Sequence, residues 1–129
     1  MPNMDWYELL VKPYGTPPAE VFRIVWPILY ILMGIGLYLA IKAAPKGQAG
    51  RIIAAFLVQI VLNLMWSPIF FVGQNIGGAL VVLVLLLCAI VWMLYEFYRY
   101  SKTAAFLNLP YVLWVSFAGY LNFALWQLN

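Results

Sequence analysis

The chain has 129 residues, of which 67% are hydrophobic and 9% are charged, and its formal net charge is +3. Soluble domains are roughly a quarter charged and about half apolar, so a soluble chain of this length could not bury so much apolar surface. The composition therefore excludes a soluble globular protein and predicts an integral membrane protein with a single domain, residues 1–129. The modest positive charge indicates membrane topology, and we expect no nucleic-acid partner.

Residues 1–20 are too polar and too rich in proline to cross a membrane. Residues 5–11 predict a short amphipathic helix that lies in the interface. Residues 12–18 contain three prolines and a glycine, which predicts a stiff loop. The first ten residues lack the basic segment and the apolar core of a signal peptide.

Four apolar runs are each long enough to cross ~30 Å of hydrocarbon as a helix. They predict an all-α bundle of four transmembrane helices, at about residues 21–41, 52–72, 79–97 and 103–126. Pro27 should bend the first helix, where Gly34 and Gly36 should let a neighbour approach closely. The third run is almost purely aliphatic, which favours a lipid-facing or scaffolding helix. Pro110 interrupts the fourth run.

Basic residues gather in two of the connections. Lys42, Lys46 and Arg51 lie in the first loop, and Arg99 and Lys102 lie between the third and fourth runs. Cytoplasmic loops carry an excess of lysine and arginine, so these two loops are predicted to be cytoplasmic. Both termini and the turn at residues 73–78 are then on the non-cytoplasmic side.

Residue types that metal and catalytic sites require are scarce. Histidine is absent, which removes the commonest metal ligand and the usual axial ligand of haem. Cys88 is the only cysteine, so no intrachain disulfide can form. The four acidic residues are scattered along the chain. We therefore expect no metal site, no catalytic residues and no required cofactor.

Polar side chains recur at a helical spacing in the second run. Gln59, Asn63, Trp66 and Phe70 stand at i, i+4, i+7 and i+11, so they project from one side of a helix. An amide in hydrocarbon is costly unless it finds a hydrogen-bond partner. These side chains therefore either join neighbouring helices or face a polar ligand, and the spacing alone leaves both alternatives open.

Three groups of motifs, in order along the chain, resemble those of one membrane protein family. The first group is Trp6-Tyr7, Lys12-Pro13, Pro17-Pro18, Val25-Trp26-Pro27-Ile28-Leu29-Tyr30 and Met33-Gly34. The second is Gln59, Leu62-Asn63, Trp66-Ser67-Pro68 and Phe70-Phe71. The third is Pro110-Tyr111, Trp114, Tyr120-Leu121-Asn122, Trp126 and Leu128-Asn129. Each motif is weak by itself, but the ordered set resembles the TspO family of tryptophan-rich sensory proteins and translocator proteins, also known as peripheral benzodiazepine receptors.

The resemblance implies a five-helix membrane bundle whose first helix precedes Trp6. This chain is therefore expected to lack that helix, either in its gene or only in the sequence in hand. The family's place in bacteria implies the cell membrane, and a homodimer partner could fill the gap. Tyr14 and Gly15 stand where family members often have loop tryptophans, which weakens the case for chemistry at that loop.

The resemblance also implies a sensor or carrier that binds protoporphyrin IX or a related tetrapyrrole, with sterols as further ligands. Aromatic faces stack on conjugated rings, and amides can bond ring nitrogens or propionates. The pocket residues that carry over are Trp26, Tyr30, Asn63, Trp66, Trp114 and Asn122, supported by Gln59, Pro17 and Pro18. Each could instead be a packing residue. Val91, Tyr95 and Arg99 fit a loose sterol-binding pattern.

Two other functions stay open at this point. Light-dependent porphyrin breakdown has been attributed to some family members, and its enzymatic status is disputed. A structural role, as a dimer partner with a degenerate pocket, is the other. The sequence shows no general base, nucleophile or metal cluster for ordinary catalysis, so an enzyme is not favoured.

Overall fold

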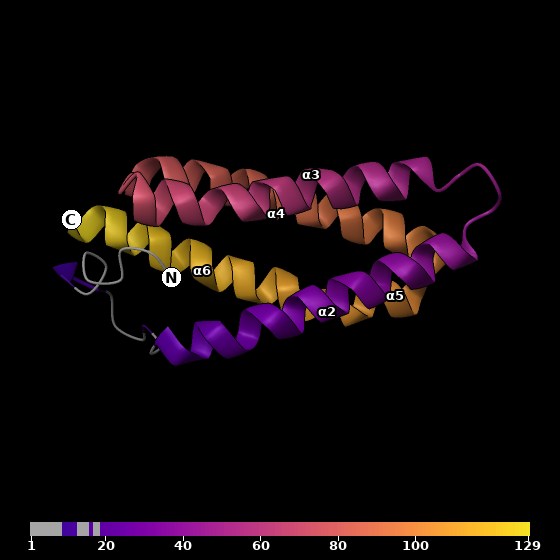
Figure 1. Cartoon of the computed structure of the whole chain (residues 1–129), viewed down its shortest axis with the longest axis horizontal. Helices are drawn as coiled ribbons and strands as arrows, with labels where there is room; N and C mark the ends of the chain where they lie inside the picture. The colour runs from indigo at the N-terminus through magenta and orange to yellow at the C-terminus, as the bar shows by residue number, and fades with distance from the viewer. Residues whose placement is uncertain (1–8, 13–15, 17–18) are drawn as a thin grey trace.

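The computed structural model describes residues 9–12, 16 and 19–129, and this part of the chain is a bundle of antiparallel helices (Figure 1). The helices are α2 (Ala19–Ala43), α3 (Gly50–Ser67) with a π-helical extension η1 (Pro68–Val72), α4 (Ile76–Tyr100), α5 (Lys102–Leu107) and α6 (Leu109–Leu128). They provide four segments that are long and apolar enough to span a membrane. The predicted all-α membrane fold is confirmed. The first three predicted spans lie inside α2, α3 with η1, and α4, whereas the fourth crosses the break between α5 and α6.

The fourth span is broken, but not at the proline. The break between α5 and α6 falls at Asn108, and Pro110 lies in the first turn of α6. Proline is tolerated there because the first N–H groups of a helix have no partner within it. Pro68 marks a different irregularity, since it opens the π-helical turn that Gly73 N closes on Pro68 O at 2.9 Å.

Side-chain caps shape two of the connections. Asn75 precedes α4, and its Oδ1 accepts a hydrogen bond from Gly78 N at 2.8 Å. Ser101 precedes α5, and its Oγ accepts from Ala104 N at 3.2 Å. Both caps satisfy backbone donors that the helices leave free, so the chain can reverse direction within a few residues.

Helix α4 is the scaffold of the bundle. It contacts α2, α3, α5, α6 and η1. Of the four spans it also has the largest buried share, 39% against 22–33% for the others. Its buried side chains follow a heptad-like spacing along one side, namely Leu83, Leu86, Ile90, Met93 and Phe97. Of the two roles predicted for the third span, scaffolding is the one that describes its packing, although Val81, Val84 and Leu85 on its other side are exposed.

The two glycines of α2 have different surroundings. A Cβ on Gly36 would collide with Asn108 Nδ2 and lie 2.9 Å from Phe97 Cε2, whereas a Cβ on Gly34 would meet nothing within 4 Å. Within the described residues of this chain, Gly36 serves close helix approach and Gly34 does not, so a close neighbour at Gly34 stays a prediction. The Asn108 amide fits against Gly36 and donates to Leu32 O at 3.2 Å and to Ala104 O at 3.0 Å. This contact joins α2 to the α5–α6 junction.

The beginning of α2 and the end of α6 lie at the same end of the bundle, as four spans require (Figure 1). The Asn129 side chain pairs with the Val11 backbone there, accepting from its N–H at 3.1 Å and donating to its carbonyl at 2.9 Å. Most of the predicted interfacial helix, residues 5–11, lies outside the described residues. The side of the membrane on which this end lies stays a prediction.

Gly36→Ala should destabilise the protein by about 1–3 kcal/mol, because the added methyl group overpacks the contact with Phe97 and Asn108. Gly34→Ala is the matched control in the same helix. It should be neutral or stabilising by up to about 1 kcal/mol, because alanine is the better helix former and the site is open. Thermal unfolding of both variants in detergent tests the pair, and equal effects would contradict the packing described.

Candidate functional site

The amides of α3 face the interior of the bundle, as their spacing predicts. Gln59 is 0% exposed and Asn63 is 7% exposed. Phe70, two to three turns further on, is also buried, and Trp66 is half-buried. A helix places these positions on one side because four residues come close to one turn. The side chains are therefore directed at α2 and α6 rather than at lipid.

Tyr111 of α6 is the centre of a hydrogen-bonded chain of side chains. Its hydroxyl accepts from Asn63 Nδ2 at 2.8 Å and donates to Gln59 Oε1 at 2.7 Å. Tyr111 is 0% exposed, so both bonds lie away from solvent and lipid. A buried hydroxyl and two buried amides would each cost free energy if unpaired, and here they satisfy one another.

This series of hydrogen-bonded side chains reaches α2 at both of its ends. Tyr30 donates to Asn63 Oδ1 at 2.5 Å, and Gln59 Nε2 contacts Met33 Sδ at 3.6 Å. Tyr30 is 38% exposed, which makes it the outer end of the chain. Its ring packs against Trp26 one turn earlier, with ring centroids 6.0 Å apart. We name Tyr30, Asn63, Tyr111 and Gln59 the tyrosine–amide chain.

A second polar contact lies one turn along α3. Trp66 Nε1 donates to Asn122 Oδ1 at 3.0 Å, and Asn122 Nδ2 donates to Ile76 O at 3.0 Å. The indole of Trp66 also stacks on Phe70, with centroids 5.1 Å apart. Asn122 is 1% exposed, and it thus joins α3, α6 and the beginning of α4.

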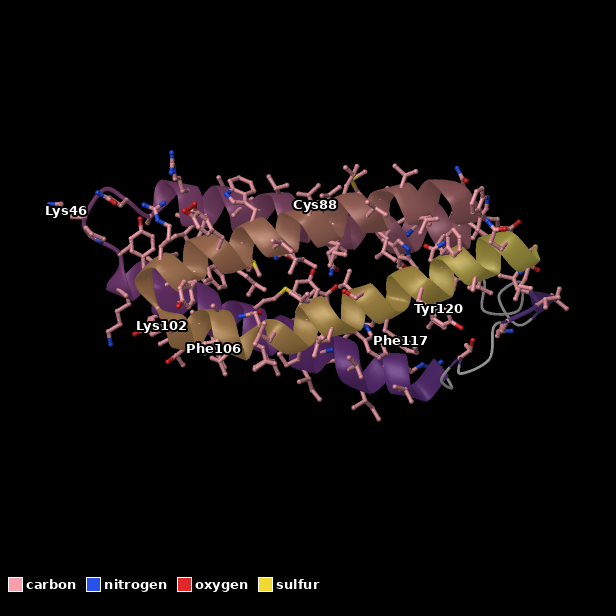
Figure 2. All side chains as sticks on the ribbon, turned by 180° about the vertical axis from the view of Figure 1, so that it is seen from behind. Lys46, Cys88, Lys102, Phe106, Phe117 and Tyr120 are labelled. Carbon is pink, nitrogen blue, oxygen red and sulfur yellow. The ribbon has the colours of Figure 1, made fainter. Side chains whose placement is uncertain are left out.

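An apolar groove lies between α2 and α6. It has a volume of about 440 Å³ and is lined by Val25, Ile28, Leu29, Leu32, Pro110, Leu113, Trp114 and Phe117. Val25, Ile28 and Leu32 stand on the flank of α2 away from Tyr30, because a helix turns by about 100° per residue. From Phe117, which lines the groove, α6 continues to Tyr120 (Figure 2), and the two rings stack with centroids 6.3 Å apart.

The described residues predicted for one pocket fall into three places. Hydrogen bonds link Tyr30, Asn63 and Gln59 in one group and Trp66 with Asn122 in another, and Trp26 packs on Tyr30. Trp114 instead lines the groove on the other flank of α2. The helix-joining alternative for the amides describes their contacts in this structure. Pro17 and Pro18 lie outside the described residues.

Sequence reasoning missed Tyr111 and Asn108. Tyr111 stands at i, i+4, i+7 and i+11 with Val115, Ala118 and Asn122, so the spacing that singles out Gln59 and Asn63 on α3 also applies on α6. Asn108 has no such signal. Its role depends on the carbonyl of Leu32, which is remote in sequence.

The donor set suits an organic ligand better than a metal ion. Among the residues that the structure describes, no group of three or more His, Cys, Asp or Glu side chains lies close enough to hold a metal ion. Aromatic faces and neutral amides offer stacking and hydrogen bonds. What this region can do chemically is bind a flat molecule that is largely apolar and has a few polar atoms.

Comparisons with known proteins agree on one family. The sequence profile of the TspO/MBR family matches residues 1–127. The chain is 43% identical over 129 residues to the tryptophan-rich protein TspO of Chlorobaculum tepidum, covering 99% of this chain and 82% of that protein. It is 38% identical to protein CrtK of Rhodobacter capsulatus, covering 96% of this chain and 78% of the relative. The human translocator protein is 37% identical, with coverage of 98% and 76%.

Tyr111→Phe should destabilise the protein by about 1–3 kcal/mol, because it leaves Asn63 Nδ2 and Gln59 Oε1 without their common partner inside the membrane. Tyr95→Phe is the matched control, since Tyr95 is 61% exposed on α4. Unfolding in mixed micelles measures both. A Tyr111→Phe protein as stable as the wild type would show that the tyrosine–amide chain contributes nothing to the stability of the fold.

Proposed function

The chain belongs to the TspO/MBR family of integral membrane proteins, and on that premise we propose that it is a sensor or carrier that binds a tetrapyrrole such as protoporphyrin IX. A porphyrin ring is flat and conjugated, with nitrogens at its centre and propionates at its edge. Its binding requires aromatic faces beside a small number of hydrogen-bonding groups within an otherwise apolar wall.

The outer end of the tyrosine–amide chain is the observation that carries this proposal. Tyr30 is partly exposed, and its ring packs on Trp26 while its hydroxyl bonds the buried Asn63. An aromatic pair therefore lies directly beside a hydrogen-bonding group at membrane depth. A porphyrin stacked on this pair would place a propionate or a ring nitrogen within reach of the Tyr30 hydroxyl.

Binding would exchange one hydrogen bond for another. The Tyr30 hydroxyl donates to Asn63 in this structure, and a ligand acceptor would compete for that donor. Asn63 would still be bonded to Tyr111, so only one end of the chain has to change. Asn63 Oδ1 would lose its donor in this exchange, which costs about 1–3 kcal/mol unless a ring N–H of the ligand takes that place.

The groove between α2 and α6 supplies a second aromatic wall. Trp114 lines it, and its other lining residues are apolar. It offers stacking surface without a charged group, which favours the hydrophobic face of a ligand over its propionates. Tyr30 of α2 and Trp114 of α6 thus mark two surfaces on opposite flanks of α2. Variants at the two positions distinguish which surface contributes to ligand binding.

Two finer parts of the proposal concern partners. A sterol would meet Val91, Tyr95 and Arg99, all of which are exposed on α4. A homodimer would cover α2 and α3, whose spans are each 22% buried and therefore the least buried of the four. Measuring the molecular mass in detergent during the ligand titration reports on the dimer.

Tyr30→Phe should weaken protoporphyrin IX binding about fivefold, the equivalent of one hydrogen bond worth about 1 kcal/mol. Tyr38→Phe is the matched control, since Tyr38 lies two turns further along α2 and is 62% exposed. Binding is followed by quenching of tryptophan fluorescence in detergent or nanodiscs.

Three outcomes of that titration would contradict the proposal. The first is no quenching of the wild-type protein at micromolar porphyrin. The second is an equal loss of affinity in Tyr30→Phe and Tyr38→Phe. The third is unchanged affinity when Asn63→Ala and Trp114→Ala are combined, since this pair alters both flanks of α2. Coloured breakdown products that form only in light and in proportion to protein would instead favour a light-dependent reaction.

A further inference from the structure

We propose that one end of the bundle binds the headgroups of anionic phospholipids. This end, which we name the basic end, comprises Lys42, Lys46, Arg51, Arg99 and Lys102. These are five of the seven lysines and arginines in the sequence. The inference does not depend on tetrapyrrole binding, since it concerns different residues at the opposite end from the α6 terminus.

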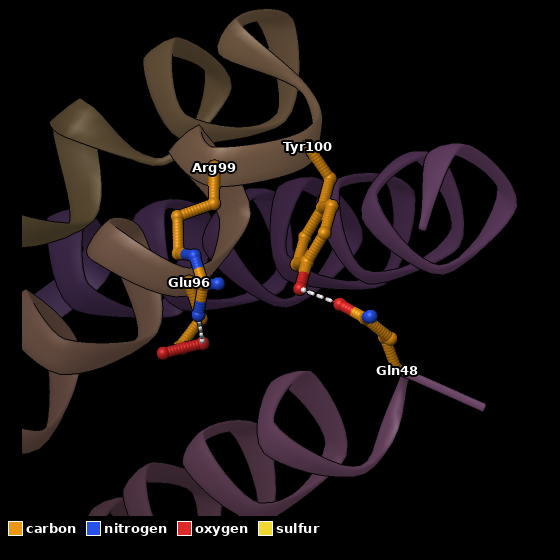
Figure 3. Close-up of polar contacts among 4 residues, drawn as sticks. All are labelled: Gln48, Glu96, Arg99 and Tyr100. Atoms are coloured by element: carbon orange, nitrogen blue, oxygen red, sulfur yellow. Dashed lines mark hydrogen bonds and ion pairs between the residues drawn. The ribbon is translucent and has the colours of Figure 1, made fainter. Parts of the chain in front are cut away.

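The fold brings two separate basic segments together. Lys46 lies in the α2–α3 loop and Lys102 begins α5, and both are at the same end of the molecule (Figure 2). All five basic residues are exposed. The Tyr100 hydroxyl donates to Gln48 Oε1 at 3.3 Å, which ties the α2–α3 loop to the end of α4 (Figure 3).

The basic end has little acidic compensation. Glu96 is the one acidic side chain at this end in the part of the chain that the structure describes, and it is 2% exposed. Its Oε2 pairs with Arg99 at 3.4 Å (Figure 3). Among the described residues, Lys42, Lys46, Arg51 and Lys102 therefore have no acidic partner within 4.0 Å, and their charge is available to an outside anion.

Tyrosine rings pack beside three of the cations of the basic end. Lys42 Nζ is 5.8 Å from the ring centroid of Tyr38, and Lys102 Nζ is 5.8 Å from that of Tyr98. Arg99 lies 5.4 Å from the ring of Tyr100. Tyrosines at the ends of spanning helices lie at the boundary between hydrocarbon and headgroups, so cations that pack on them lie beside lipid phosphates.

Charge complementarity selects the occupant. Each exposed lysine or arginine beside a membrane raises the affinity for anionic lipids about fivefold. Zwitterionic lipids have no net charge and should gain little. The attraction should also weaken as salt rises, because the Debye length falls to about 8 Å at physiological ionic strength.

The test compares lipids and variants in detergent. Wild-type protein is titrated with dioleoylphosphatidylglycerol or dioleoylphosphatidylcholine, and bound lipids are counted by native mass spectrometry. The test variant is Lys46→Gln/Arg51→Gln/Lys102→Gln. The matched control is Arg23→Gln, which removes an exposed cation near the opposite end of α2. Equal melting temperatures in neutral detergent verify that the variants are folded.

The proposal expects the wild type to prefer phosphatidylglycerol and the triple variant to bind it about a hundredfold more weakly, since each cation contributes about fivefold. Arg23→Gln should bind it as the wild type does. Equal binding of the two lipids by the wild type would overturn the proposal, as would equal losses in the triple variant and the control. Displacement of the lipid by millimolar inorganic phosphate would also overturn it, because the site would then recognise a free anion.

Discussion

Buried amides in a membrane must find partners, and this constraint determines how α2, α3 and α6 meet. Lipid offers no hydrogen bonds, so Gln59 and Asn63 can be paired only by protein or by a ligand. Tyr111 pairs with both. Because its hydroxyl accepts one bond and donates the other, α3 and α6 are held in one register. Tyr30 then extends the same set of bonds to α2.

The same arrangement explains why the aromatic surfaces of α2 are divided. One flank carries Trp26 and Tyr30 beside the polar chain, and the other carries the apolar lining of the groove with Trp114 opposite. The core of the bundle lies between them, because Leu29 and Met33 are almost completely buried. The Tyr30 flank brings a partly exposed aromatic pair beside a hydrogen-bonding group, which is the combination that a porphyrin would require.

The sequence predicts the spans because hydrophobicity over some twenty residues determines what can cross a bilayer. It also predicts which side of α3 is buried, because helical spacing aligns Gln59 with Asn63. It cannot predict that Tyr111 is their partner, since spacing shows which side of α6 is polar but not which helix that side faces. The break at Asn108 and the groove at Trp114 are equally hidden, because both depend on contacts between helices remote in sequence.

The central claim is that Tyr111 and the α3 amides act as one coupled unit, and a double-mutant cycle between Asn63→Leu and Tyr111→Phe tests it most directly. The free energy of unfolding is measured in mixed micelles for the wild type, both single variants and the double variant. The account predicts a coupling free energy of about 1 kcal/mol between the two positions. Either substitution alone already breaks the hydrogen bond between Asn63 and Tyr111, so the second one does not lose it again. Effects that add to within about 0.3 kcal/mol would contradict it.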